Sequence, residues 1–388
     1  MTAEIVLARI SLMKPWLGAE EAKALAEVVA SGHVGQGPRV KEFEAGFSAV
    51  QDLRHAVATS SCTAALHLAL VAAGIGPGDD VIVPSLSFMA TANAVTYVGA
   101  RPVFCDVDPA TGNVTAETIH AALTLDTRAV IVVDQCGVPV DLDPIRELCD
   151  RHEITVIEDA ASAVGSLYKG RPVGSGADLT VWSFHADKVI TTGEGGMLTT
   201  HRADWAARAR TLREHSRGSS PSDGQDPVQP RPDVYLEIGF NYRMTDLQAA
   251  VGIVQLRRLA QVVSRRREIA AMYAAGLTGL NGLRLVADPP FGTTNYQSFW
   301  VEVLPGFATS REGLLSRLAD AGISATRGIM AAHRQPAYRW RDTGSARLQH
   351  TERLTDSTVI LPVFHELDTV SIKRIINTIQ TAGGGGGK

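Results

Sequence analysis

The stretch "LTVWSFHADKVITTGEGG", residues 179–196, decides the fold class of this chain. It opens with an almost unbroken apolar run and closes in a glycine-rich turn, and Lys188 lies between the two. Apolar runs of this kind are typical of strands buried on both faces, as in a mainly parallel sheet covered by helices. A lone lysine at such a strand end is either an ordinary surface residue or a functional group. The other motifs of the sequence distinguish between these two interpretations.

Similar apolar runs recur before this stretch and alternate with helical patterns. Four of them read as strands: "DVIVPS" (80–85), "PVFCDVD" (102–108), "AVIVVDQCG" (129–137) and "ITVIEDAAS" (154–162). Apolar residues at helical spacing occupy 19–32, 62–74 and 88–99, each ending in a glycine, a natural helix stop. The alternation predicts one large α/β domain over residues 1–245.

The remainder of the chain predicts a smaller α+β domain over residues 246–380. A long helical pattern begins at 241 and continues to 277, and it is followed by a strand-like run at 296–304 and helical patterns at 310–322 and 368–380. For two segments the sequence predicts neither helix nor strand. Residues 216–233, rich in Ser, Pro, Gly and Asp, indicate an exposed loop, and residues 381–388 a flexible glycine-rich tail.

Composition narrows the class of protein. Hydrophobic residues make up 45% and charged residues 20% of the 388 residues, and the net charge is −4, which argues against a nucleic-acid partner. The first residues lack the pattern of a signal peptide, and no apolar run approaches the roughly 20 residues that span a bilayer. The four cysteines show no metal-binding spacing. We therefore expect a cytoplasmic enzyme with reduced thiols, no metal and no membrane contact.

Two polar residues at strand ends suggest a cofactor. Asp159 ends one apolar run and Lys188 follows another, and in open α/β sheets ligands bind at the carboxyl ends of strands. The two residues form either a simple salt bridge or the two anchors of pyridoxal phosphate. That cofactor requires a lysine amine for its aldehyde and a carboxylate beside its ring nitrogen, because an opposite charge favours the protonated ring.

The phosphate and the ring of such a cofactor have candidate partners as well. The hydroxyl residues Ser60, Ser61 and Thr63 lead directly into a predicted helix, and a helix N-terminus binds phosphate through its free N–H groups. An ordinary helix cap is the alternative. Phe88 follows a strand and is a candidate to stack on the ring, although a single aromatic there is more often part of the core.

With these residues in place, the chain resembles the DegT/DnrJ/StrS family of sugar aminotransferases, which depend on pyridoxal phosphate. The resemblance covers nearly the whole chain and rests on six segments in the family's order: "SSCTAAL", "DVIVPSLSFMATANAV", "GARPVFCDVD", "VIEDAAS", "SFHADKVITTGEGGM" and "GFNYRMTDLQAAVGIVQL". It implies the fold of type I pyridoxal-phosphate enzymes, a mainly parallel sheet flanked by helices. The lysine of the opening stretch is then catalytic, and the glycines after it allow the backbone to turn sharply.

The resemblance also implies roles for individual residues. Lys188 bonds the cofactor and Asp159 faces the pyridine nitrogen. Other cofactor contacts implied by the family are Thr63, Ala64, Phe88, Ser183 and Asn241, and Ser162 is expected as a further contact from its position three residues after Asp159. Asn241 reaches the cofactor of the neighbouring subunit in the family, so we expect a homodimer with shared sites.

Substrate contacts are expected from five further residues: His185, Glu194, Arg327, His333 and Arg334. The last three lie in "GISATRGIMAAHRQPAYRW", where solvated surface charge is the alternative. Two positions depart from the family, because Ser162 replaces the usual Gln or His and Cys62 replaces a usual Gly. Neither change removes a group that transamination needs.

These expectations lead to one main hypothesis about function. We expect an aminotransferase that moves an amino group from L-glutamate to a keto-sugar, in particular a nucleotide-linked 4-keto- or 3-keto-6-deoxysugar. The alternatives are a cyclitol (inosose) aminotransferase of antibiotic biosynthesis, a sugar dehydratase that uses pyridoxal phosphate, and a non-catalytic homologue that only binds the cofactor. Some dehydratases of this type have His in place of the lysine, so Lys188 argues against that reaction.

Overall fold

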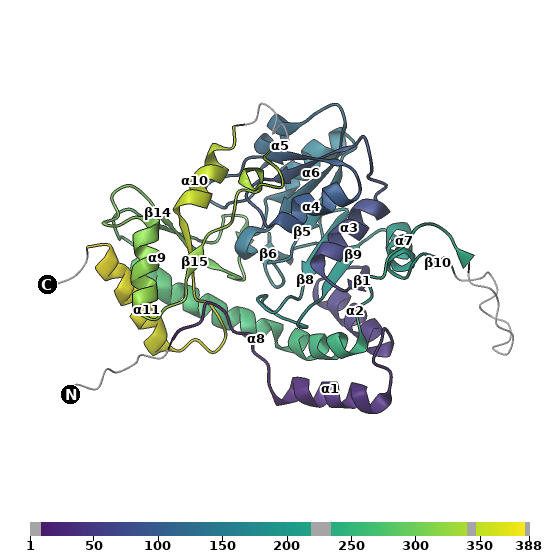
Figure 1. The fold of residues 1–388 in the computed structure, drawn as a ribbon, viewed down its shortest axis with the longest axis horizontal. Coiled ribbons are helices and arrows are strands. Elements are labelled where there is room, and N and C mark those ends of the chain that lie inside the picture. The colour runs from purple at the N-terminus through teal and green to yellow at the C-terminus, as the bar shows by residue number, and fades with distance from the viewer. Residues whose placement is uncertain (1–8, 219–233, 340–346, 385–388) are drawn as a thin grey trace.

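The structure, a computed structural model, describes residues 9–218, 234–339 and 347–384. A seven-stranded sheet forms the large part of the molecule and a four-stranded sheet the smaller part (Figure 1). The long helix α8 (Asp246–Leu277) runs between them, and it contacts α1 (Ala19–Ser31) and α2 (Pro38–Val50) of the large part and α11 (Thr369–Ala382) of the smaller part. The predicted domain boundary after residue 245 coincides with the start of this helix, which contacts both parts. The division into two domains stays a prediction.

The large sheet is mainly parallel, as the apolar runs predict. Its strand order is β1 (His55–Thr59), β9 (Gly196–Thr200), β8 (Leu179–Ser183), β5 (Thr155–Asp159), β4 (Thr127–Val133), β2 (Asp80–Pro84) and β3 (Arg101–Cys105). Strands β8, β5, β4, β2 and β3 are parallel to one another, and only β9 runs antiparallel to both neighbours. The α/β fold class is confirmed. Because β8 and β5 are parallel, Lys188 and Asp159 come at the same edge of the sheet.

Helices cover both faces of this sheet, because its strands alternate buried side chains between two apolar clusters. Ile82 belongs to one cluster and its neighbours Val81 and Val83 to the other. The second cluster holds α3 (Cys62–Ala72), α4 (Met89–Tyr97) and α7 (Ala203–Arg213). The first holds α2 (Pro38–Val50), α5 (Ala116–Ala122), α6 (Leu142–Arg151) and α8.

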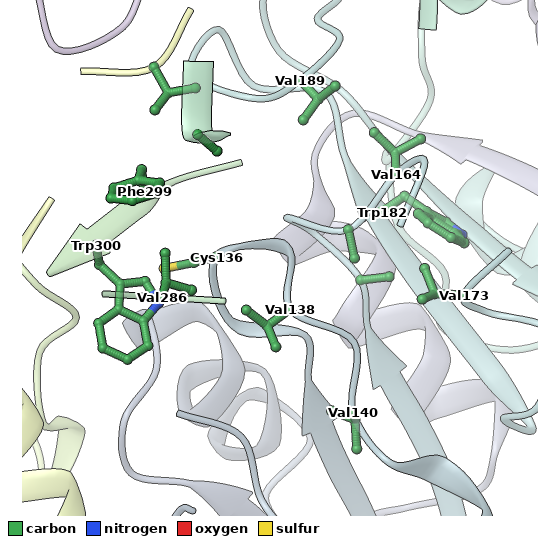
Figure 2. Close-up of a cluster of buried hydrophobic side chains, with 14 of the residues drawn as sticks. Cys136, Val138, Val140, Val164, Val173, Trp182, Val189, Val286, Phe299 and Trp300 are labelled. Carbon is green, nitrogen blue, oxygen red and sulfur yellow. The ribbon is translucent and has the colours of Figure 1, made fainter. Parts of the chain in front are cut away.

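Figure 2 shows how the first cluster joins the two parts of the molecule. Cys136 and Val138, in the loop after β4, lie between Trp300 of the small sheet and Trp182 of the large sheet. All four side chains are buried, and full burial of an apolar side chain contributes about 1.5–3 kcal/mol. The loop after β4 is therefore fixed from both sides, next to the edge where Asp159 lies.

The smaller part combines the C-terminal segments with the start of the chain. Its sheet has the order β12 (Leu283–Leu285), β14 (Phe299–Val303), β16 (Thr358–Leu361) and β15 (Thr326–Arg327), with helices α9 (Arg311–Asp320), α10 (Gln349–Ser357) and α11 (Thr369–Ala382). Ile10 donates a 2.9 Å hydrogen bond to the carbonyl of Gly322 and accepts one of 2.9 Å from Ser324. Helix α11 continues two residues into the predicted tail, of which residues 385–388 lie outside the described residues.

Most predicted helices are found where the sequence places them. Helix α1 (Ala19–Ser31) ends at Gly32, whose φ of 74° is the left-handed conformation that glycine favours. The long helix, in contrast, starts at Asp246 and not at 241. Thr245 ends the extended segment, because its hydroxyl accepts the N–H of Gln248 at 3.2 Å while Gln248 Oε1 accepts the N–H of Thr245 at 2.9 Å.

The remaining elements are short. A three-stranded sheet contains β13 (Gly292–Thr293), β6 (Leu167–Tyr168) and β7 (Arg171–Pro172), and a hairpin contains β10 (Arg217–Gly218) and β11 (Val234–Tyr235). Two single turns of 3-10 helix are η1 (Gln135–Gly137) and η2 (Ala332–Arg334). Of the predicted loop 216–233, residues 219–233 lie outside the described residues. In the part of the chain that is described, no helix combines the length and apolarity that crossing a membrane requires.

Candidate active site

Lys188 lies in the loop that joins β8 to β9. Its backbone N–H donates to the carbonyl of His185 at 3.0 Å, and its half-buried amine Nζ lies 3.2 Å from Ser162 Oγ. The glycines after it close the loop: Gly193 has a φ of 82°, and the carbonyl of Gly195 accepts the N–H of Phe184 at 2.9 Å. The loop therefore turns the chain back onto the sheet and holds the amine over the end of β5.

Asp159 ends β5 as a buried carboxylate with donors on both oxygens. Oδ2 accepts the hydroxyl of Thr91 at 3.1 Å, and Oδ1 accepts the N–H of Ala161 at 3.2 Å. The Cys62 thiol lies 4.0 Å from Oδ1 as a weak third donor. Burial raises the pKa of Asp159 above its ordinary value, and the Ala161 bond and the Lys188 charge offset only part of that rise. These donors orient the carboxylate and favour its ionised form.

The N-terminus of α3 lies beside these two residues. Ser61 caps the helix by accepting the N–H of Ala64 at 3.1 Å. Gly196 packs directly on this turn, since a Cβ at that position would overlap the backbone of Ser61. Gly196 pairs with Ser183, so the end of β8 and the start of α3 meet there. The free N–H groups of the first turn, among them that of Thr63, form a positive end suited to a phosphate.

Phe88 is the N-cap residue of α4 and its side chain is 68% exposed. Thr91, the donor to Asp159, lies in the first turn of the same helix, three residues later. A large aromatic ring left open to water beside a buried carboxylate fits a position that a planar cofactor ring covers. The predicted anchors thus supply an amine, a carboxylate, a helix N-terminus and a ring face, which is the donor set of pyridoxal phosphate.

The predicted substrate residues fall into three groups. His185 and Glu194 meet beside Lys188, with 3.7 Å between Nε2 and Oε1, and Asp187 lies 3.7 Å from the other ring nitrogen of His185. Arg327 is 67% exposed and lies 3.5 Å from a carboxylate oxygen of Glu312.

The third group is held by α10. Arg334 pairs with Asp356 at 2.8 Å and with Glu352 at 3.3 Å, and His333 contacts the same Glu352 at 3.2 Å. The structure therefore brings His333 and Arg334 together around one carboxylate. The substrate role of all five residues stays a prediction.

Asn241 lies in the extended segment before α8 and is exposed. The backbone there is held against α3, because the N–H of Ser60 donates to the carbonyl of Tyr242 at 2.8 Å. The structure contains one chain, so the contact of Asn241 with a second subunit stays a prediction.

Sequence reasoning missed two groups that support the site. Thr91 and Ser87 are both buried, with 2.9 Å between their hydroxyl oxygens, and they link α4 to Asp159. The spacing of Thr91 from Phe88 places it in the same first helical turn, which is a usable signal. Asn295 donates to the carbonyls of Ser162 and Val164 at 2.8 and 2.9 Å. It lies far along the chain, and no local pattern announces it.

Comparison with models of known protein families identifies the family of the chain. The model of the DegT/DnrJ/EryC1/StrS aminotransferase family matches residues 15–380. The chain belongs to this family. Like other members of the DegT/DnrJ/EryC1/StrS aminotransferases, it is an enzyme that depends on pyridoxal phosphate.

Individual family members resemble the whole chain. The chain is 38% identical over 378 residues to GDP-perosamine synthase of Caulobacter vibrioides, covering 96% of this chain and 98% of that protein. Among solved structures it is 37% identical to the aminotransferase TlmJ from Streptoalloteichus hindustanus, with a TM-score of 0.88 and coverage of 96% and 98%. The Spr1654 protein of Streptococcus pneumoniae, in its pyridoxamine-phosphate (PMP) form, gives a TM-score of 0.91 at 26% identity, covering 97% and 99% of the two chains. The type I fold expected from the sequence is confirmed.

Proposed function

We propose that the protein transfers an amino group from L-glutamate to a nucleotide-linked keto-sugar, a 4-keto- or 3-keto-6-deoxysugar. One observation carries the sugar assignment: the chain matches GDP-perosamine synthase, which is named for a GDP-linked product, at 38% identity over nearly its full length. The site residues support the transfer chemistry and leave the sugar and its ring carbon to experiment. The cytoplasmic location expected from the sequence belongs to the same proposal.

The residues of the chain divide the work of amino transfer. Pyridoxal phosphate, when bound, supplies an aldehyde that accepts amino groups and a ring that withdraws electrons from the neighbouring carbon. Asp159, placed at the pyridine nitrogen, keeps that nitrogen protonated, because a carboxylate favours the charged form. Thr63, Ala64 and Ser183, gathered at the start of α3, bind the phosphate. Phe88 covers one face of the ring.

Lys188 has two tasks in this proposal. Its amine holds the resting cofactor, and once a substrate amine displaces it, the same amine carries a proton between substrate carbon and cofactor. Ser162, 3.2 Å from the amine, accepts a hydrogen bond from it and keeps it near the reacting atoms. The loop closed by Gly193 and Gly195 gives the lysine a fixed base from which its flexible side chain swings.

A second copy of the chain completes the site in this proposal. The segment before Asn241 exposes four large apolar residues, namely Val234, Tyr235, Leu236 and Ile238. Exposed apolar side chains gathered in one short segment mark an interaction site, and a homodimer covers them. Asn241, only three residues further along, then enters the neighbouring subunit and binds its cofactor phosphate.

The substrate side of the proposal uses the polar groups around the lysine loop. His185 and Glu194, exposed beside Lys188, are placed to bind sugar hydroxyls. Arg327 and Arg334 are cations of the smaller part, suited to a substrate carboxylate or diphosphate.

An assay with ¹⁵N-labelled glutamate tests this function. The protein is incubated with a panel of nucleotide-linked keto-sugars and with inososes, and the label is followed into product by mass spectrometry. We expect label in a nucleotide-linked amino sugar. Label in an aminocyclitol establishes the cyclitol alternative, loss of a hydroxyl without label establishes the dehydratase, and no change in cofactor absorbance with glutamate establishes the non-catalytic homologue.

A further inference from the structure

The side chain of His333 lies between the two parts of the molecule and is engaged at both ring nitrogens. Nδ1 lies 2.6 Å from Ser85 Oγ, and Nε2 lies 3.2 Å from Glu352 Oε1. Ser85 directly follows β2 and is fully buried, whereas Glu352 belongs to α10. His333 thus joins the large sheet to the smaller part through two hydrogen bonds.

The backbone around His333 strengthens the contact with Ser85. Ala332 donates its N–H to the carbonyl of Ser85 at 2.7 Å, and His333 donates its own N–H to Ser85 Oγ at 3.2 Å. Because the Glu352 carboxylate only accepts hydrogen bonds, we assign the ring proton to Nε2, and the hydroxyl of Ser85 then donates to the bare Nδ1 while its oxygen accepts the N–H of His333. Every polar group of Ser85 except its own N–H is therefore fixed by the segment that carries His333.

The residues that follow Ser85 form part of the cofactor site. Ser87, two residues later, has its hydroxyl 2.9 Å from that of Thr91, which donates to Asp159. Phe88, the candidate for the ring face, comes next. The segment 85–88 belongs to no strand or helix; Leu86 pairs with Ala331 in a single β-bridge and its carbonyl accepts the Gln135 amide, so the position of the segment depends on such contacts.

We propose that His333 is a positioning residue, which holds Ser85 and thereby sets Phe88 and the Ser87–Thr91 pair against the cofactor. The inference rests on the proposed cofactor residues and goes beyond them. A substrate contact through the imidazole requires breaking one of its two present hydrogen bonds, whereas the positioning role uses both as they stand. Glu352, which also binds Arg334, extends the same network to a predicted substrate residue.

Two amide substitutions separate the two ring nitrogens. The shorter side chain of His333→Asn brings its amide to the position of Nδ1, and the longer one of His333→Gln brings its amide to the position of Nε2. The dissociation constant of pyridoxal phosphate is measured by titrating each apoprotein and following cofactor absorbance. We expect His333→Ala and His333→Gln to weaken binding about tenfold and His333→Asn to stay within about twofold of the wild type, since a hydrogen bond contributes about 1 kcal/mol.

Tyr338→Phe is the matched control, because Tyr338 also ties this segment to the large part. Its hydroxyl lies 2.8 Å from Asn93 Oδ1, on α4 but away from Ser85. We expect this variant to lower the apoprotein melting temperature as much as His333→Ala while leaving cofactor binding unchanged. If Tyr338→Phe and His333→Ala lose equal amounts of cofactor affinity, the proposal is overturned. It is also overturned if His333→Gln and His333→Asn bind pyridoxal phosphate with the same dissociation constant. Since no sugar enters the titration, failure of the sugar assignment does not affect the result.

Discussion

The carboxyl groups of Asp134 and Glu158 lie next to each other in the core, with Glu158 on β5 and Asp134 directly after the neighbouring strand β4. Glu158 is the residue before Asp159, and both members of the pair are almost completely buried. Burial is the main cause that raises the pKa of Glu158 to about 7, and burial together with the Glu158 charge raises that of Asp134. Such a pair is stable when one proton is shared between the two groups.

This pair predicts a pH dependence of stability. The unfolded chain releases these protons near pH 4, whereas in the folded protein burial raises the pKa of both groups, that of Glu158 to about 7. Between the two values the folded state binds more protons, so the free energy of unfolding falls as pH rises. Asp134→Asn removes one carboxyl and should reduce that fall by about 1–2 kcal/mol. Urea unfolding at a series of pH values between 4.5 and 7.5 measures the free energy of unfolding, and Asp126→Asn, at an exposed position, is the control. If the free energy of unfolding depends on pH in the same way in wild type and Asp134→Asn, the prediction is wrong.

Thr91 should control cofactor affinity through Asp159. Thr91→Val keeps the shape of the side chain but removes a donor to a buried carboxylate, a bond of about 1.5–3 kcal/mol. We expect the apoprotein to bind pyridoxal phosphate roughly 10–100-fold more weakly. Thr91→Ser restores the hydroxyl and should recover most of the affinity. Equal affinities for the Val and Ser variants would show that the hydroxyl has no part in orienting Asp159.

Lys188 should be the only lysine that carries the cofactor. Borohydride reduction of the wild type followed by peptide mass spectrometry should place the label on Lys188, while Lys188→Ala still binds the cofactor without covalent attachment. Loss of the proton carrier alone should lower kcat by roughly 10²–10⁴-fold. Lys169→Ala is the control, because that lysine is exposed and paired with Asp143. A labelled peptide from any other lysine excludes Lys188 as the attachment point.

Ser162 should assist the lysine without being essential. Ser162→Ala removes the hydrogen-bond partner of Nζ, and we expect kcat to fall by less than about a hundredfold, near 2.7 kcal/mol. Steady-state kinetics at saturating glutamate measure the effect. A larger loss would mean that the Ser162 hydroxyl takes a direct part in the chemistry.

Shared sites in a homodimer predict that two inactive variants rescue each other. If Asn241 serves the neighbouring subunit, a mixed dimer of Asn241→Ala and Lys188→Ala has one intact site. Co-expression with random pairing should then recover about a quarter of wild-type activity, although each variant alone is weak. Sedimentation should show that Asn241→Ala still dimerises, since one polar contact is a small part of an interface. No gain above the separate variants would disprove sharing through Asn241.

The continuous apolar runs predicted the fold class, because a strand that is buried on both faces of a sheet needs apolar residues at nearly every position. Lys188 and Asp159 were found for a related reason, since each is a polar residue at the end of such a run. Thr91 and His333 show the limit. Thr91 lies on an ordinary helical turn, and the partner of His333 is Ser85, at a sequence separation of 248. The Ser85–His333 bond depends on how the large and the smaller parts of the molecule pack, and His333 carries no local sign of it, whereas the only local sign of the role of Thr91 is its spacing from Phe88.

The hydrogen bonds that Ile10 makes with Gly322 and Ser324, in the connection between α9 and β15, also have a consequence for how the chain is made. Ile10 leaves the ribosome before its partners, which are synthesised roughly 300 residues later. At the usual 5–20 residues per second, this delay is roughly 15–60 s. During that time the large sheet can assemble alone, while the apolar residues of the opening segment stay uncovered and available to chaperones. The smaller part of the molecule is complete only when the segment at Ile10 and the segment at Gly322 and Ser324 are both present.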